Sequence, residues 1–332
     1  MITILVHEGG TTRRAPRVEP TWLEPASPVV LWVDLASPTP EELRLLDGPF
    51  AFHELAVEDA RSAMAFPKVE AYTGFLYVIL HGIDVVEGKH RIRTRDVDFF
   101  VTRNALVTVH DGGSTSIADL QGQCDRHGRA MAEGPIGLVH RVIDLMVDHY
   151  RPAMEELERR LEALEEDAFA GHQPMSQRVM RTRRELASVR RVLVLQRDVI
   201  GRLARREFPA VSDEMAYRFR DAYDQVARLT EEVILFQDRV TGIFEVSLAT
   251  VSNRLNQVMK VLTVMSTIFL PLTVLTGMWG MNVALPHFPG GDGAQFWWVV
   301  GIMTGMVGLM LGLFRRNRWI LCGFAPAWHR ER

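Results

Sequence analysis

The chain has 332 residues and a formal net charge of −3, and 47% of its residues are hydrophobic. This charge balance shows no bias toward nucleic acid, which we exclude as a partner, and the apolar content is enough to bury a core over most of the chain. The two cysteines, Cys124 and Cys322, lie far apart in sequence and indicate neither a disulfide framework nor a thiolate zinc site.

The first 135 residues predict a mixed α/β domain. Apolar, β-branched runs predict strands at 2–6, 29–33, 75–80, 97–101 and 105–109. Helical patterns between or after these strands cover 40–46 and 116–124. Residues 1–14 lack the apolar stretch of a signal peptide, so membrane insertion would depend on later segments.

Residues 136–260 predict a helical domain that ends in a long stalk helix. Helices are expected at 136–170 and 176–207, with breaks at Pro174 and Pro209. The next segment begins at Ser212 and contains no proline until Pro271. If it continues to Gly280, this helix is roughly 100 Å long and needs partners along its side, which favours an assembly of several copies.

The two shorter helices of this region carry opposite charge. The simpler interpretation is ion pairing across an antiparallel hairpin, and the alternative is an acidic surface that attracts cations toward a pore entrance. The acidic set is Glu155, Glu156, Glu158, Glu162, Glu165, Glu166 and Asp167, and the basic set is Arg178, Arg181, Arg183, Arg184, Arg190 and Arg191.

Two uncharged apolar segments predict transmembrane helices at 261–280 and 296–314. Each is roughly 28 Å long, close to the thickness of the hydrocarbon layer, and a buried pair of core helices is the alternative. The flanking cations are Arg254, Lys260, Arg315, Arg316 and Arg318. Because 282–295 contain no Lys or Arg, the positive-inside rule predicts an extracytoplasmic loop at 281–295, cytoplasmic termini and a basic cytoplasmic tail at 315–332. We expect a multi-pass protein of the cell (inner) membrane.

The triplet Gly280-Met281-Asn282 lies at the outer end of the first of these segments. These residues can present neutral oxygens to a hydrated divalent cation, and this segment has no charged ligand that could replace the waters of such an ion. The consistent mechanism is outer-shell recognition, in which Asn282 carbonyl oxygens accept hydrogen bonds from the waters of the ion. The ion then moves down its electrochemical gradient.

Longer motifs surround this triplet. They read Asn-Gln-Val-Met-Lys-Val-Leu-Thr at 256–263, Ser-Thr-Ile-Phe-Leu-Pro-Leu-Thr at 266–273 and Gly-Met-Trp-Gly-Met-Asn at 277–282. Upstream, 219–224 read Phe-Arg-Asp-Ala-Tyr-Asp, 57–59 read Val-Glu-Asp and 67–70 read Pro-Lys-Val-Glu. With these motifs the chain resembles the CorA-type magnesium transporter family from about Glu58 to Arg318.

This resemblance implies a funnel-shaped homopentamer in the lipid bilayer that conducts Mg²⁺, and also Co²⁺ and Ni²⁺. The first span of each subunit would line a central pore, with Gly280, Met281 and Asn282 as the selectivity filter. The implied pore-lining residues are Asn256, Met259, Leu262, Leu270 and Thr273. A 3.5-residue period from Asn256 favours Thr263 over Leu262, so both stay open. Hydroxyls in this span either face protein or water, or bond back to the preceding helical turn.

The resemblance also implies regulation through carboxylates. Glu58, Asp59 and Asp221 would bind Mg²⁺ at subunit interfaces and hold the pore shut when the ion is plentiful, and hard oxygen ligands suit that ion. Glu245 matches a position at the cytoplasmic pore mouth. Without the resemblance, Glu58, Asp59 and Asp221 are typical of solvated helix ends and faces.

The loop after Asn282 departs from the family pattern. It lacks the glutamate of a Met-Pro-Glu-Leu sequence and contains His287 and Asp292 instead. An imidazole suits softer ions, so Zn²⁺ is a further candidate cargo, and a zinc-transporting relative of the same superfamily is the alternative function. Met281 argues for the magnesium branch.

Two other classes of protein were weighed against a transporter. A membrane-anchored sensor that never conducts shares the predicted architecture, although the neutral polar residues of the first span argue against it. An enzyme is not expected, because the sequence contains no phosphate loop, no nucleophile elbow and no recognisable pair of acid and base.

Overall fold

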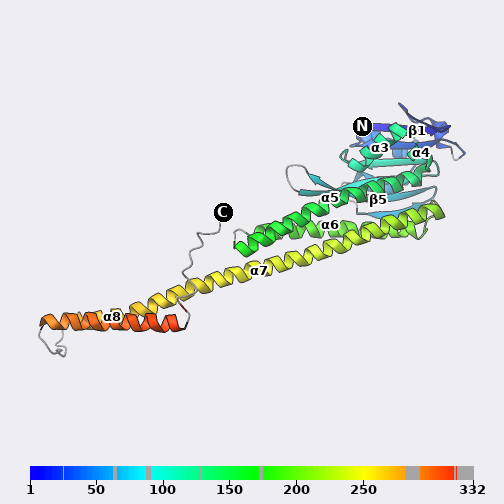
Figure 1. Cartoon of the computed structure of the whole chain (residues 1–332). Helices are drawn as coiled ribbons and strands as arrows, with labels where there is room; N and C mark the ends of the chain where they lie inside the picture. Colours follow the sequence, from blue (N-terminus) through cyan, green and yellow to red (C-terminus); the bar gives the residue numbers. More distant parts are fainter. Residues whose placement is uncertain are drawn as a thin grey trace. The chain divides into compact units, whose positions relative to one another are not determined.

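The computed structural model describes residues 1–24, 26–62, 66–86, 91–127, 129–171, 175–281, 292–317 and 319. The chain divides into two compact units, Met1–Phe244 and Glu245–Arg332. The first unit holds an α/β domain, a helical hairpin and the beginning of a long helix (Figure 1). The second unit holds the rest of that helix and a C-terminal helix.

Seven strands form one mixed sheet in the order β2-β1-β3-β7-β6-β5-β4. They are β1 (Ile2–Glu8), β2 (Thr11–Arg14), β3 (Val30–Ala36), β4 (Lys68–Tyr72), β5 (Phe75–Val86), β6 (Arg91–Val101) and β7 (Ala105–His110). β3 and β7 run parallel, and the other neighbours are antiparallel. The five predicted strands are confirmed. The sequence analysis does not predict β2 and β4: β2 contains no apolar residue, and β4 is only five residues long.

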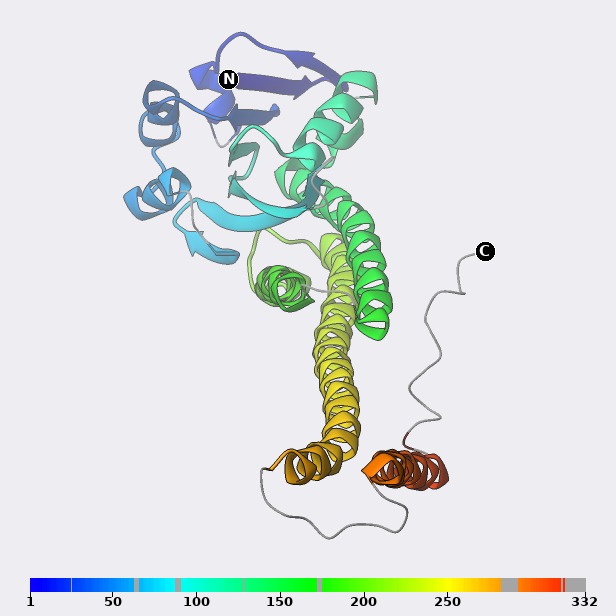
Figure 2. The ribbon, with the colours of Figure 1, turned by 90° about the vertical axis from the view of Figure 1, so that its left-hand side faces the viewer.

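Helices cover both faces of this sheet (Figure 2). The short ones are η1 (Pro20–Leu23), α1 (Pro40–Asp47), α2 (Glu54–Arg61), α3 (Thr115–His127) and α4 (Arg129–Ala132). Leu46 of α1 and Val57 of α2 are buried in one core with strand residues such as Val33. The predicted helix at 40–46 is confirmed, and it begins at a capping box formed by Thr39 and Glu42. The predicted helix at 116–124 lies within α3.

Three long helices follow, namely α5 (Gly134–Ala170), α6 (Met175–Ala204) and α7 (Asp213–Trp279). Both α5 and α6 pack on β5. α6 ends before the predicted position 207, because the chain turns at Arg206, whose φ is 59°. The 67 residues of α7 confirm the predicted continuous helix. At its start, Ser212 Oγ accepts a hydrogen bond from the Met215 N–H at 3.3 Å.

The first part of α7 buries one face within the first unit. Its buried side chains recur every three or four residues, which is the period of an amphipathic helix. They are Met215, Ala216, Phe219, Ala222, Val226, Thr230, Val233, Phe236, Val240 and Ile243. Beyond Ile243, no described residue of α7 is buried.

Ion pairs link α5 to both of its helical neighbours. Arg178 of α6 pairs with Asp167, and Arg160 of α5 reaches Glu185 of α6 at 2.7 Å. Arg239 of α7 binds Glu165 at 3.1 Å. Ion pairing across the hairpin is therefore confirmed, although the charges pair in both directions and α7 takes part of the acidic set.

Candidate ion path and regulatory carboxylates

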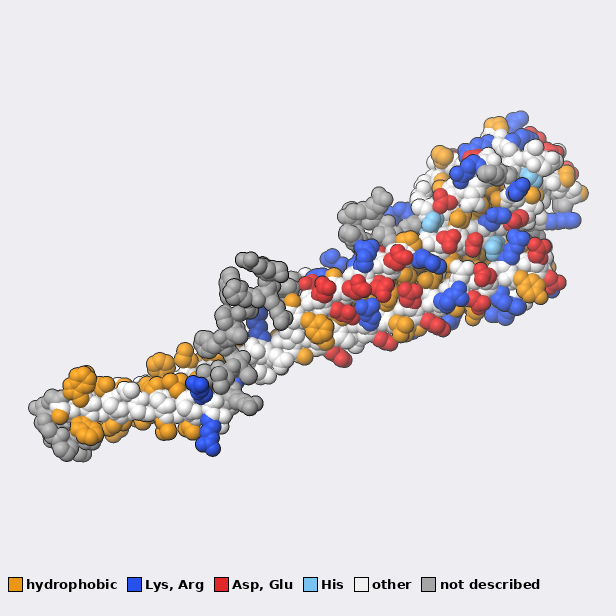
Figure 3. Space-filling view, viewed as in Figure 1, with side chains coloured by type: hydrophobic (Ala, Val, Ile, Leu, Met, Phe, Trp, Pro, Cys, Tyr) orange, Lys and Arg blue, Asp and Glu red, His pale blue; other side chains and the backbone are white. Residues whose placement is uncertain are grey.

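The second unit presents two helices with apolar surfaces, the C-terminal part of α7 and α8 (Asp292–Arg316). Both are long and apolar enough to cross a membrane. In the most apolar 18-residue segment of each helix, no residue is buried within the chain. Leu262 is 58% exposed and Leu270 is 67% exposed, and Figure 3 shows hydrophobic side chains along this unit. The alternative of a buried pair of core helices is wrong for these residues, because so much apolar surface requires lipid or other copies of the chain.

Cationic side chains mark one end of this pair of helices. Lys260 Nζ, at the start of the apolar part of α7, lies 6.0 Å from the ring centroid of Trp319. The same indole ring stacks on Phe314 with a centroid distance of 5.8 Å. Arg315 and Arg316 complete the last turn of α8. The beginning of one apolar segment and the end of the other are therefore adjacent, and both are positively charged.

The predicted pore-lining residues share one face of α7. At 3.6 residues per turn, Asn256, Met259, Leu262, Leu270 and Thr273 fall within an arc of about 120°, and all five are exposed. Thr263 falls inside this arc, whereas Leu262 lies at its edge, so the backbone accommodates both choices.

The threonine hydroxyls of this segment bond to the helix itself. Each donates to the carbonyl oxygen four residues earlier at 2.7–3.0 Å. The four residues are Thr263, Thr267, Thr273 and Thr276. Bonding back to the preceding turn is therefore confirmed for them. A hydroxyl that donates in this way keeps lone pairs that can accept a hydrogen bond from water.

α7 ends where the triplet begins. The Gly280 N–H continues the helical pattern with a hydrogen bond of 2.9 Å to Thr276 O. A Cβ at position 280 would lie 3.1 Å from that same oxygen, so glycine relieves a close approach here. Met281 is exposed. Asn282 and His287 lie outside the described residues, as does the side chain of Asp292, so their roles stay predictions.

The predicted regulatory carboxylates all lie at the surface. Glu58 is exposed on α2, and Asp221 is exposed on α7, where it accepts a hydrogen bond of 2.8 Å from Gln225 Nε2. Glu245, expected at a pore mouth, is exposed as well. Within the described part of one chain, no group of three or more His, Cys, Asp or Glu side chains converges on a point that could hold a metal ion. Shared binding by Glu58, Asp59 and Asp221 would therefore need more than one copy of the chain.

Asp59 already has a cationic partner. Lys68 Nζ lies 2.6 Å from Asp59 Oδ2 and 2.9 Å from Glu70 Oε2, and Tyr72 donates its hydroxyl to that Glu70 oxygen at 3.0 Å. Burial alone would lower the pKa of Lys68, but the hydrogen bonds from its ammonium to Asp59 and Glu70 hold that pKa above its ordinary value. The ammonium lies 5.5 Å from the ring centroid of Tyr77.

A buried acid, Asp98, lies beneath this surface network and is not among the residues that the sequence motifs identify. Tyr77 donates its hydroxyl to Asp98 Oδ1 at 2.5 Å. Burial raises the pKa of Asp98 to about 7, although the Tyr77 hydrogen bond acts to lower it. The available signal was the carboxylate within the otherwise apolar run 97–101, where Val97 and Phe99 flank Asp98.

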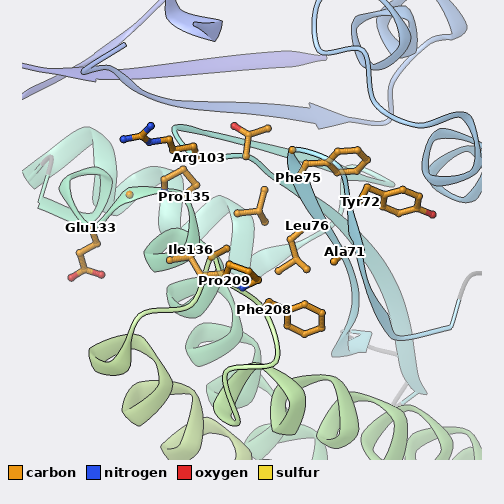
Figure 4. A pocket seen from close by; sticks show the side chains of 15 residues that line it. Ala71, Tyr72, Phe75, Leu76, Arg103, Glu133, Pro135, Ile136, Phe208 and Pro209 are labelled. Atoms are coloured by element: carbon orange, nitrogen blue, oxygen red, sulfur yellow. The ribbon is translucent and has the colours of Figure 1, made fainter. Parts of the chain in front are cut away.

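A cavity of about 540 Å³ opens in the first unit between the strand turns, the start of α5 and the segment that joins α6 to α7. Its wall is mainly apolar, with Phe75, Leu76 and Phe208 among the lining residues (Figure 4). Arg103 and Glu133 point away from these side chains, and Glu133 binds Arg141 at 2.6 Å. Among the described residues that line this cavity, no acid and base converge.

A family model described as CorA-like Mg2+ transporter protein matches residues 28–316. The chain belongs to this family. The match covers both units and every motif on which the resemblance was based. Members of the CorA-like family are transporters, which agrees with the prediction that the protein is not an enzyme.

Individual relatives agree with the family assignment. Cobalt/magnesium transport protein CorA of Thermotoga maritima is 28% identical over 277 residues, covering 82% of this chain and 78% of that protein. The solved structure titled "The complete structure of CorA magnesium transporter from Methanocaldococcus jannaschii" matches with a TM-score of 0.84 and 22% identity. That match covers 96% of this chain and 99% of that one, and it confirms the predicted architecture of a soluble α/β domain, a long helix and two apolar helices.

The zinc branch gives a weaker likeness. The cytoplasmic domain of ZntB from Vibrio parahaemolyticus has a TM-score of 0.59 at 14% identity, and the match covers 76% of this chain and 98% of that one. This similarity concerns the fold alone. Among these comparisons, the CorA-like family is therefore the better supported assignment.

Proposed function

We propose that this protein is a Mg²⁺ channel of the inner membrane that also admits Co²⁺ and Ni²⁺. The observation that carries the proposal is the family match over 28–316, combined with an uncharged, exposed α7 segment that leads into Gly280-Met281-Asn282. The relative from Thermotoga maritima is named for cobalt and magnesium transport. Its cargo is transferred to this chain as part of the proposal.

In the proposed assembly, five copies arrange their α7 helices around a central axis. The face that carries Asn256, Met259, Leu270 and Thr273, with Leu262 or Thr263, lines the pore. Hydroxyl and amide oxygens there accept hydrogen bonds from the water shell of the ion, so no carboxylate is needed to strip that shell. The second apolar helix, α8, faces lipid. This arrangement accounts for the exposure of α7 beyond Ile243, because neighbouring copies and lipid cover it.

The proposed domain layout follows the membrane. Residues 1–135 form the cytoplasmic α/β domain, 136–260 the helical domain and stalk, 261–280 and 296–314 the spans, 281–295 the outer loop, and 315–332 the cytoplasmic tail. The adjacent cationic ends at Lys260 and Arg315 support placing both termini on the same, cytoplasmic, side.

The regulatory part of the proposal uses Mg²⁺ bound at subunit interfaces by Glu58, Asp59 and Asp221, with Glu245 forming an acidic ring at the cytoplasmic mouth. The residues fit such an ion, because all are surface carboxylates and hard oxygens suit Mg²⁺. A bound divalent cation would hold neighbouring subunits together, and its loss at low internal Mg²⁺ would let the pore open.

The decisive experiment is ion uptake into proteoliposomes that contain the full chain, with Mg²⁺, Co²⁺, Ni²⁺ and Zn²⁺ supplied in turn. We expect the wild type to take up Mg²⁺. In Asn282→Ala the rate of uptake should be at least about tenfold lower, which corresponds to roughly 1.4 kcal/mol in the activation free energy of permeation. Asn317→Ala is the matched control, since it removes an amide that follows α8 and has no part in the proposed filter.

Other outcomes distinguish the alternatives. Equal Mg²⁺ uptake by Asn282→Ala and the wild type would remove the selective role of the amide. Uptake of Zn²⁺ in preference to Mg²⁺, dependent on a proton gradient, would assign the chain to the zinc branch. No uptake of any of the four ions would favour a sensor that does not conduct.

A further inference from the structure

Two carboxylates of the first unit converge on a single cation that belongs to the chain itself. Lys68 Nζ lies within 2.9 Å of oxygens from both Asp59 and Glu70, which come from α2 and β4. The side chains of Asp59, Lys68 and Glu70 are 37%, 32% and 43% exposed. Ions in solution can therefore reach the pair, although the ammonium of Lys68 already occupies the point at which the oxygens meet.

The surroundings hold this ammonium in place. Lys68 lies on β4, where the backbone pairing of Lys68 with Ile79 of β5 fixes its position. The Tyr72 hydroxyl orients Glu70 through its hydrogen bond, and the Tyr77 ring lies under the ammonium, where its negative face favours a cation. A lysine anchored in a sheet and attracted by three groups is a persistent counter-ion of Asp59.

We propose that Lys68 is a tethered counter-cation that competes with Mg²⁺ for Asp59 and thereby sets the internal Mg²⁺ concentration at which the channel closes. The inference rests on the proposed regulatory role of Asp59. A divalent ion that binds Asp59 must displace the ammonium or lie beside it, and either event costs free energy because a bond is lost or like charges repel. Regulation then begins at a higher Mg²⁺ concentration than a free carboxylate would require.

The opposite role for Lys68 gives the opposite result, which makes the proposal testable. If Lys68 only positions Asp59 for the ion, its removal releases the carboxylate and weakens Mg²⁺ binding. If Lys68 competes with the ion, its removal strengthens binding. The sign of the change therefore separates the two roles without any assumption about its size.

The experiment compares the full-length wild type with Lys68→Met, which keeps the length of the aliphatic chain and removes the charge. Mg²⁺ binding is measured as the rise in Tm of the detergent-solubilised protein with Mg²⁺ concentration, and inhibition is measured as Mg²⁺ uptake against Mg²⁺ inside proteoliposomes. We expect the Mg²⁺ concentrations that give half of the rise in Tm and half of the inhibition to fall about tenfold. A tenfold change corresponds to roughly 1.4 kcal/mol in the free energy of Mg²⁺ binding.

Two controls accompany this variant. Lys68→Arg keeps a cation at the same position, and we expect its half-effective concentrations to stay within about twofold of the wild type because the competing charge remains. Arg61→Met removes a cation that lies on α2, the helix of Asp59. Arg61 pairs with Asp47 at 2.6 Å. We expect no change in either Mg²⁺ titration for that variant.

The results separate failure of this inference from failure of the proposed function. An unchanged or higher half-effective Mg²⁺ concentration in Lys68→Met, with a normal response in the wild type, would overturn the competition. If the Tm of the wild type does not change with Mg²⁺ and its uptake does not change with Mg²⁺ inside the proteoliposomes, the regulatory role of Asp59 is overturned, and the inference with it. A fall of similar size in Arg61→Met would show that general surface charge is responsible, and would also overturn the specific role of Lys68.

Discussion

The two units of this protein differ in where their side chains find partners. In Met1–Phe244, α7 buries a face from Met215 to Ile243 against the same chain, whereas in Glu245–Arg332 no described residue is buried. The single helix α7 therefore has a part with a buried face and a part without one. Helical periodicity alone therefore does not define a core. The first part of α7 is stabilised by packing against its own chain, whereas the described side chains of the second part pack into no core of this chain.

Hydrogen bonds between residues far apart in sequence distinguish the first unit, whereas bonds within one helix occur in both units. The first unit buries polar side chains and satisfies them across long sequence distances, as with the 2.8 Å hydrogen bond from Gln121 Nε2 to Asp34 Oδ2. In the second unit, four threonines of α7 bond to carbonyl oxygens four residues earlier, and the buried Thr230 of the first unit does the same with Val226 O. A segment with no core of its own must satisfy its polar groups locally, as membrane-spanning helices do.

The largest expected effect compares phenylalanines in the two parts of α7. Phe219 is fully buried and Phe269 is 60% exposed. Phe219→Ala should lower the free energy of unfolding by about 3–5 kcal/mol, because it leaves a cavity in the core. Phe269→Ala should change it by less than about 1 kcal/mol in detergent, where micelle contacts replace those of lipid.

Unfolding by denaturant, followed by tryptophan fluorescence, to which the buried Trp22 and Trp32 of the first unit contribute, measures both variants in detergent. Similar losses in the two variants would contradict the division, since they would require Phe269 to pack against the chain as tightly as Phe219 does.

A second effect concerns the buried acid of the first unit and depends on pH. The pKa of Asp98 rises from its ordinary value of 3.8 to about 7 in the folded chain. Between these values the unfolded chain releases a proton that the folded chain retains, so Asp98 contributes stability below pH 3.8 that is lost as the pH rises to 7. The loss is roughly 4 kcal/mol at most.

Asp98→Asn keeps the acceptor for the Tyr77 hydroxyl and removes the titration. Between pH 4 and 7, we expect the free energy of unfolding of this variant to depend less on pH than that of the wild type. The difference in free energy between the two proteins should therefore change steadily toward neutral pH. Denaturant unfolding at a series of pH values measures the difference, and parallel curves would refute the buried, neutral state of Asp98.

The smallest expected effect concerns the polar groups of the second unit. The Thr273 hydroxyl donates to Phe269 O at 2.9 Å, so Thr273→Val removes a locally satisfied group and keeps the shape of the side chain. We expect Mg²⁺ uptake by proteoliposomes to fall by less than about threefold, below 1 kcal/mol. A loss as large as that expected for Asn282→Ala would mean that this hydroxyl recognises the water shell of the ion as strongly as the proposed filter amide does.

Much of the fold follows from local patterns in the sequence. Apolar alternation and β-branched runs identify five strands of the sheet, and the absence of proline between Ser212 and Pro271 identifies α7. Pro271 itself lies within the helix. The edge strand β4 is missed because it is only five residues long, although Lys68 and Glu70 alternate with apolar residues as in a half-buried strand.

The candidate site is less predictable for a physical reason. Motifs identify Asp59 as a carboxylate of interest, but its partner Lys68 comes from another element, and a spacing of nine residues carries no information about a 2.6 Å contact. Asp98 is hidden for the same reason, since its partner Tyr77 lies on the neighbouring strand β5. Contacts that depend on the pairing of strands appear only once the sheet is assembled.

The single parallel pair of the sheet has a consequence for biosynthesis. β3 joins β7 with Leu31 beside Ala105, whereas β4, β5, β6 and β7 follow one another as antiparallel neighbours. Strands β1 to β3 leave the ribosome early and must wait for β7 before the sheet can close, because contacts so distant in sequence form late. The nascent N-terminal strands therefore keep an unpaired edge until the whole β-region has been translated, and an unpaired strand edge is open to pairing with other chains during that interval.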